Sequence, residues 1–219
     1  PALRIDALQD LRPLASLSDE DMVNAQRGAL LDSTSPNPSV ETLLHTFLPQ
    51  KFIDHTHSTA VLAVTDQPDG AKIAADIYGD RAALVPYVMP GFDLAIKAAE
   101  VYEANPEVEG LILLKHGIFS FGETAREAYE RMISLVSLAE DRLKKGRKKV
   151  FASAELPKKI TPLAEVAPIL RGLMAESDGM TEPRRMVLDY RTSKAIRNYV
   201  DGKEVGRYSQ IGVVTPDHN

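Results

Sequence analysis

The chain of 219 residues contains no cysteine and no tryptophan, and only 6% of its residues are aromatic. Without cysteine it can form neither disulfides nor thiolate–metal bonds, so metal chemistry in this chain must use imidazole and carboxylate ligands. The lack of disulfides fits a reducing compartment, and we expect a cytoplasmic protein. No apolar run approaches the length of a membrane span, so no membrane association is expected.

Positive charge is not in excess either. The chain has 26 Lys and Arg against 31 Asp and Glu, a formal net charge of -5. A nucleic-acid binder normally presents a basic face, so we expect no nucleic-acid partner. With 44% hydrophobic residues the chain can bury a substantial core. It begins at Pro1 without a methionine and stops abruptly at Asn219, which suggests a piece of a longer protein.

Apolar strand-like runs alternate with helical patterns through the first two thirds of the chain. Ser18 and Ser39 are expected to cap helices, because a serine hydroxyl accepts a hydrogen bond from the first turn. Residues 59–65 fit a helix or a strand equally well. Strands are expected around the histidines at 55–57 and at 82–88 and 111–115, and helices at 40–48, 71–78, 92–105 and 123–145.

This alternation predicts an α/β fold, a layered domain with a central sheet flanked by helices, over residues 1–150. Beyond it, residues 151–219 are predicted to form a small C-terminal extension or linker toward a missing downstream domain. Within this extension we expect helices at 163–176 and 193–200 and a strand at 185–189. No cluster of reactive residues there indicates chemistry.

Three of the five histidines lie in two places that a sheet can bring together. On a strand, residues i and i+2 face the same way, so His55 and His57 can bind one metal ion, although such pairs also occur on ordinary strands. His116 follows the apolar run 111–114 and lies where a buried strand gives way to a loop. Three imidazoles are the ligand count of a catalytic zinc site with one open position. We predict Zn²⁺ at these histidines, or another divalent transition metal.

Proton transfer beside a metal needs a further titrating group, and Glu41 is the candidate. It precedes His45 by one helical turn and leads within a few residues to His55. The alternative is a first-turn glutamate that stabilises the helix dipole. His45 is interpreted as a structural neighbour rather than a ligand. Tyr87 lies in a loop after a strand, where site residues are common, and its alternative role is packing.

Taken in order, these motifs resemble the class II aldolase/adducin family. The resemblance covers roughly residues 15–145 and includes the pairs Pro86-Tyr87 and His116-Gly117 and the helix that begins near Glu123. More narrowly, residues 38–45 and 215–218 look like the aldolase half of bacterial bifunctional rhamnulose-1-phosphate aldolase/short-chain dehydrogenase proteins.

The resemblance implies zinc-dependent retro-aldol cleavage of a phosphorylated ketose, such as rhamnulose-1-phosphate, to dihydroxyacetone phosphate and an aldehyde. It implies metal ligation by His55, His57 and His116 and acid/base catalysis by Glu41. Tyr87 would assist proton transfer from a neighbouring subunit, in a homo-oligomer that family analogy makes a tetramer. Ser39 matches a position that contacts the substrate phosphate in the family.

The family's phosphate-binding loop of glycine, asparagine and serine is not found before Glu41. Residues 1–38 contain a single glycine, Gly28, and Val40 stands where the family has a second serine. Either the loop lies in a missing N-terminal segment or the phosphate is bound differently. Two alternative functions stay open. The first is a metal-dependent epimerase or decarboxylase of the same superfamily. The second is a non-catalytic, adducin-like interaction domain.

Overall fold

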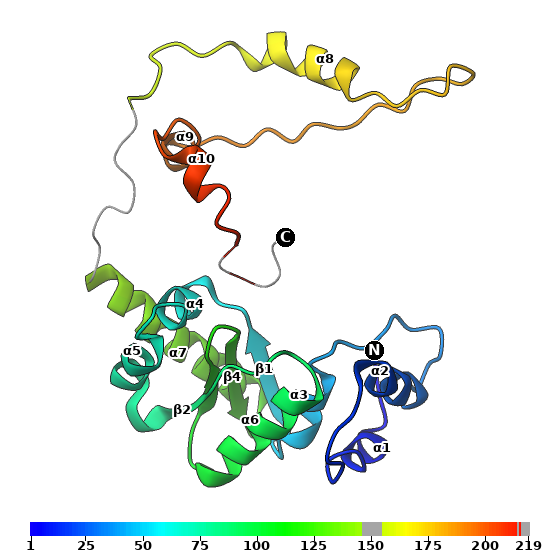
Figure 1. The fold of residues 1–219 in the computed structure, drawn as a ribbon, viewed down its shortest axis with the longest axis vertical. Coiled ribbons are helices and arrows are strands. Elements are labelled where there is room, and N and C mark those ends of the chain that lie inside the picture. The colour runs from blue at the N-terminus through cyan, green and yellow to red at the C-terminus, as the bar shows by residue number, and fades with distance from the viewer. Residues whose placement is uncertain (146–154, 214, 216–219) are drawn as a thin grey trace. The chain divides into compact units, whose positions relative to one another are not determined.

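The computed structural model of the chain describes residues 1–145, 155–213 and 215. Contacts divide the chain into two units, residues 1–147 with 213–219, and residues 148–212. The predicted domain boundary at residues 150 and 151, and residues 216–218 of the C-terminal motif, lie outside the described residues. The first unit contains the four-stranded sheet (Figure 1).

Four strands form one sheet in the first unit, in the order β1-β4-β3-β2. Strand β4 runs antiparallel to both of its neighbours, whereas β2 and β3 are parallel. Every residue of β4 is buried, so this strand lies at the centre of the core. The strands are β1 (Phe52–Thr56), β2 (Ala82–Val85), β3 (Gly110–Leu113) and β4 (Gly117–Gly122).

Helices cover both faces of the sheet. Side chains alternate between the two faces along β3 and β4, so neighbouring residues pack against different helices. Leu111, Leu113 and Phe119 belong to a core cluster with residues of α3 and α6. Ile112 and Ile118 belong to a second cluster with residues of α4, α5 and α7. Burial of each such side chain stabilises the fold by roughly 1.5–3 kcal/mol. The predicted layered α/β domain is therefore confirmed.

The helical elements of this unit are α1 (Ile5–Gln9), α2 (Asp19–Gly28), α3 (Thr42–Phe47), α4 (Thr59–Thr65), α5 (Gly70–Tyr78), η1 (Gly79–Arg81), α6 (Phe92–Ala104) and α7 (Ala125–Lys145). Residues 59–65, which the sequence left open, are helical. Ser18 caps α2 as predicted, since its Oγ accepts a 3.1 Å hydrogen bond from the Asp21 amide. Strand β4 was not predicted.

The helix expected from residue 40 begins at Thr42 instead, with Glu41 at its N-cap position. The prediction that Ser39 caps this helix was therefore wrong. Its Oγ instead accepts a 3.1 Å hydrogen bond from the Glu41 amide, in a turn that precedes the helix. Glu41 therefore stands at the very start of α3, with its side chain free of the helix's own hydrogen bonding. This placement lets the carboxylate extend beyond the helix end.

The second unit contains α8 (Leu163–Leu173), α9 (Lys194–Val200) and α10 (Val205–Tyr208), none of which has a buried residue. The strand predicted at 185–189 was wrong. Its central residues Met186, Val187 and Leu188 are apolar, but the segment pairs with no strand among the described residues, and Val187 is 92% exposed. The local pairing is a single bridge between Glu176 and Arg184. No described helix is long and apolar enough to cross a membrane.

Candidate metal centre

The two closely spaced histidines come from the end of β1. His55 lies on β1 directly opposite Phe119 of β4, and His57 follows one residue after the strand ends. Their Nε2 atoms are 3.0 Å apart, so the shared facing expected for residues i and i+2 is realised. Both side chains are largely buried, with 8% and 13% of their surfaces exposed.

His116 reaches the same point from the turn between β3 and β4. Its amide donates a 3.1 Å hydrogen bond to the carbonyl of Leu113, which closes the turn. Lys115, in the middle of this turn, has a positive φ of 62°, a conformation that non-glycine residues seldom adopt. The tight turn brings the His116 ring within 5.0 Å of the His57 ring, measured between centroids.

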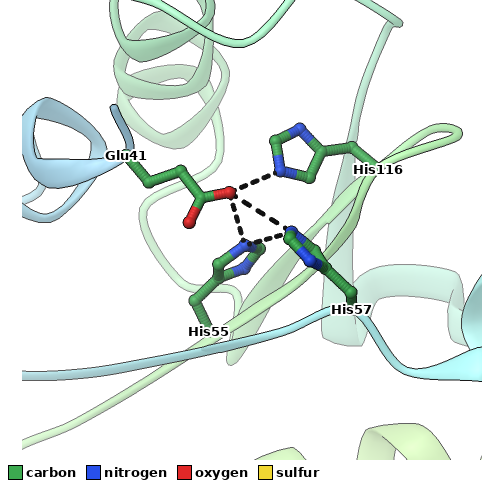
Figure 2. Close-up of side chains that lie close together, drawn as sticks. All are labelled: Glu41, His55, His57 and His116. Carbon is green, nitrogen blue, oxygen red and sulfur yellow. Dashed lines mark hydrogen bonds and ion pairs between the residues drawn. The ribbon is translucent and has the colours of Figure 1, made fainter. Parts of the chain in front are cut away.

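Glu41 supplies a carboxylate oxygen to the centre of the three rings (Figure 2). Its Oε1 lies 2.8 Å from Nε2 of His116 and 3.2 Å from Nε2 of both His55 and His57. The four donor atoms lie within 4.8 Å of one another. Residues as far apart in sequence as 41 and 116 thus form one cluster.

The proton positions at His55 follow from its second ring nitrogen. Nδ1 of His55 lies 3.0 Å from the carbonyl oxygen of Ile118, and a carbonyl can only accept, so Nδ1 carries the proton. Nε2 of the same ring faces Oε1 of Glu41 and Nε2 of His57. A proton or a metal cation among these atoms offsets the repulsion between their lone pairs.

The donor set fits a divalent transition metal. In a tetrahedral zinc site with bonds of 2.0–2.1 Å, neighbouring ligand atoms lie about 3.4 Å apart. Four of the six separations, 2.8–3.2 Å from Glu41 and 3.0 Å between His55 and His57, are slightly shorter than that, and all the donor atoms lie within 4.8 Å of one another. The hydrogen bond at His55 Nδ1 is the kind of outer contact that orients a ligand imidazole. Three imidazoles with or without the carboxylate suit zinc and its neighbours in the first transition row.

The electrostatics of Glu41 are set by the same contacts. Burial alone would raise its pKa, but hydrogen bonds with His116 and His55, and the charges of these rings, lower that pKa well below its ordinary value. Glu41 is therefore an anion at neutral pH. Its other oxygen, Oε2, accepts a 3.4 Å hydrogen bond from the Ser39 hydroxyl.

The remaining residues singled out from the sequence lie outside the cluster of donor atoms. Tyr87 is 53% exposed, and its hydroxyl lies 3.9 Å from the sulfur of Met89. His45 packs its ring against Phe119, at 5.3 Å between centroids, and burial lowers its pKa. Ser39 forms hydrogen bonds with Glu41. Among the described residues, it forms none with the three histidines.

Sequence reasoning did not assign a role to Gly117. A Cβ at this position would lie 2.6 Å from the Thr56 carbonyl oxygen and 3.0 Å from ring carbons of both His55 and His57. The missing side chain is thus what allows the two rings to pack against β4. The signal was present in the sequence, since a glycine directly follows the third histidine.

Comparisons with known proteins identify the family of this chain. The chain matches the model of the class II aldolase and adducin N-terminal domain over residues 12–143. The chain belongs to the class II aldolase/adducin family. Residues 161–219 match a second model, described as the second domain of class II aldolases. The predicted family membership is confirmed.

Similar proteins of this family include two curated bacterial sequences. An uncharacterized oxidoreductase of Bacillus subtilis, YuxG, is 38% identical over 223 residues, which cover 96% of this chain and 31% of that protein. The chain thus spans about a third of that relative's length. A methylthioribulose-1-phosphate dehydratase of Sulfurihydrogenibium is 31% identical over 144 residues, covering 55% of this chain and 67% of the dehydratase.

A solved structure shares the fold. The N-terminal class II aldolase domain of a conserved protein from Thermoplasma acidophilum is 36% identical, with a TM-score of 0.60, and the match covers 64% of this chain and 65% of that one. The likeness extends over the larger part of both chains and includes a central sheet between helices.

Proposed function

We propose that this family member is a metal-dependent lyase that cleaves a carbon–carbon bond of a phosphorylated ketose, such as rhamnulose-1-phosphate, into dihydroxyacetone phosphate and an aldehyde. The observation that carries the proposal is the convergence of three imidazole Nε2 atoms and one carboxylate oxygen at the end of the sheet. A purely structural domain has no physical need for such a cluster, because each buried polar group costs free energy unless it is satisfied.

His55, His57 and His116 would hold the metal, with zinc as the preferred ion. When bound, such an ion supplies Lewis-acid stabilisation of the negative charge that develops on the substrate's oxygens. The three rings contribute no charge of their own when neutral, so they leave the ion's positive charge undiminished. His55 is already oriented for this task by its bond to Ile118.

Glu41 would take and return the proton at the nucleophilic carbon of the ketone fragment. In the described geometry its low pKa depends on hydrogen bonds with His116 and His55. Withdrawal of Oε1 from these rings removes those bonds and lets the pKa rise, as a group that must also donate a proton requires. Ser39 holds Oε2 and so limits the directions in which the carboxylate can turn.

The test is product analysis with the purified chain loaded with zinc. Rhamnulose-1-phosphate and other ketose 1-phosphates would be supplied, and dihydroxyacetone phosphate and aldehyde would be measured separately. We expect equimolar release of both, abolished by chelator and restored by zinc. A chain that binds zinc and turns over none of these ketoses would favour the non-catalytic interaction domain, and an intact isomeric sugar would favour an epimerase.

A second candidate reaction is dehydration of a ketose 1-phosphate. It is favoured by the similarity to the Sulfurihydrogenibium dehydratase. Cleavage begins with proton removal from the hydroxyl group on the β-carbon, and dehydration with proton removal from the carbon beside the carbonyl group. Both build negative charge on the carbonyl oxygen, so one site can serve either. Mass spectrometry separates them, because dehydration keeps every carbon in one product that is lighter by one water.

Tyr87 is proposed to act in the site of a neighbouring subunit of a homo-oligomer. Its exposed ring, in a loop with the 70% exposed Met89, supports this arrangement. Mixing inactive Tyr87→Phe protein with inactive Glu41→Gln protein under conditions of subunit exchange should restore part of the activity. Restoration requires that the two residues of one site come from different chains. A mixture that stays inactive although mixed oligomers form would contradict a role for Tyr87 in the neighbouring subunit's site, and an active Tyr87→Phe protein would place Tyr87 outside the mechanism.

A further inference from the structure

We propose that Phe119 is a positioning residue that sets the plane of the His55 ring and thereby the metal affinity of the site. This inference rests on the metal centre proposed above. The rings of Phe119 and His55 are stacked, with centroids 4.1 Å apart and planes inclined by only 17°. Phe119 is completely buried, so its own ring has little freedom to move.

The stack follows from the sheet register. His55 and Phe119 are direct partners across β1 and β4, and directly opposed side chains on one face of an antiparallel pair lie in contact. Two independent constraints thus meet at His55. The carbonyl of Ile118 fixes the edge of the imidazole through Nδ1, and the Phe119 ring fixes its face. Together they aim Nε2 at Glu41.

Phe119 also contacts a second histidine ring. The ring of His45, from α3, lies 5.3 Å from that of Phe119, with planes inclined by 56°. The same helix begins directly after Glu41. Phe119 therefore packs against both the strand that carries His55 and the helix that begins directly after Glu41. A smaller side chain at this position would let both elements shift.

The neighbouring aromatic residue on the same strand is a matched control. Phe121 lies two residues along β4, is 1% exposed and belongs to the same core cluster as Phe119. Its sheet partner is Ile53, and its ring contact is with Tyr102 at 5.6 Å rather than with a histidine. Loss of either ring removes similar core packing, but only Phe119 contacts a metal-ligand candidate.

The experiment compares Phe119→Leu with Phe121→Leu in the whole chain. Apo proteins are prepared with chelator, their thermal unfolding is recorded, and zinc affinity is measured by competition with a chromophoric chelator. Cobalt(II) absorption spectra report the geometry of the ligands. We expect both variants to lose thermal stability, and Phe119→Leu alone to bind zinc about 10- to 100-fold more weakly, with an altered cobalt spectrum.

Zinc affinity within about twofold of wild type in Phe119→Leu, with an unchanged cobalt spectrum, would overturn the inference, as would an equal loss in Phe121→Leu. If Phe119→Leu does not fold, Phe119→Met keeps apolar bulk without a ring and is held to the same criteria. Wild-type protein that binds neither zinc nor cobalt would instead refute the metal centre, and with it the proposed function. Normal wild-type binding beside normal Phe119→Leu binding refutes the positioning role alone.

Discussion

The Nδ1 atom of His55 lies 3.0 Å from the carbonyl oxygen of Ile118 on the adjacent strand. A main-chain atom, rather than a side chain, therefore determines which nitrogen of this imidazole carries the proton. No single substitution of a neighbouring side chain removes that acceptor. The position of this proton on His55 is accordingly a property of the paired strands.

Replacement of His55, His57 or His116 by alanine should each lower zinc occupancy strongly, because each removes one of three converging imidazoles. The measurement is elemental analysis of protein purified without a histidine tag. His45→Ala is the control, since His45 is a nearby, half-buried histidine outside the donor cluster. Full zinc occupancy in all three variants would exclude this cluster as the metal centre.

Glu41→Gln should leave zinc bound by the histidines and reduce turnover by roughly 10²- to 10⁴-fold, the usual scale of acid–base catalysis. The amide keeps the size of the carboxyl group but cannot transfer the proton. Zinc content and the rate of aldehyde release would be measured on the same preparation. Normal turnover in this variant would remove Glu41 from the mechanism.

Gly117→Ala should destabilise the fold by about 1–3 kcal/mol, the range for overpacking a filled site, and should weaken metal binding. The added methyl group would press on the Thr56 carbonyl and on the rings of His55 and His57. Urea unfolding and zinc competition check the two effects. Gly28→Ala is the control, because a Cβ there meets nothing within 4 Å. Equal behaviour of the two variants would contradict the close approach at Gly117.

Tyr78 should make the protein less stable at alkaline pH. Burial raises its pKa from 10.0 to about 12, and among the described residues its hydroxyl has no hydrogen-bond partner. The folded state therefore holds this proton more tightly than the unfolded state. The contribution of Tyr78 is constant below pH 10 and is lost as pH rises toward 12, by up to about 1.4 kcal/mol per pH unit.

Tyr78→Phe removes that loss and also the unpaired hydroxyl. We expect its free energy of unfolding at pH 8 to equal or exceed that of wild type by up to about 1 kcal/mol. The advantage should grow between pH 10 and 12. Urea unfolding of both proteins at several pH values isolates Tyr78, because the other titrating groups are common to both. A constant difference across this range would contradict the raised pKa.

The elements that the sequence predicted well are those whose pattern is local. Residues 92–105 and 123–145 show a helical apolar stripe, and the structure has helices at Phe92–Ala104 and Ala125–Lys145. Convergence of His55 and His57 followed from the two-residue period of a strand alone. The position of His116 at the end of a buried strand followed from the apolar run before it.

What the sequence did not reveal depends on pairing between distant segments. Strand β4 went unassigned because it has a glycine at each end, and because its inner residues are buried on both faces and so show no polar alternation. The roles of Gly117 and Phe119 depend on the register of β4 against β1, which no local pattern specifies. The error at residues 185–189 has the same origin, since the apolar run there has no partner strand among the described residues.

The register of β1 against β4 has a consequence for how the protein matures. A slip of one residue would turn His55 and His57 to the opposite face of the sheet, away from Glu41 and His116. A mispaired chain could still be compact, yet it would present no converging donors. Metal would then bind only to correctly paired molecules and stabilise them by mass action. Loading with metal would thus select, late in folding, the chains with the native strand alignment over chains that differ by a single step.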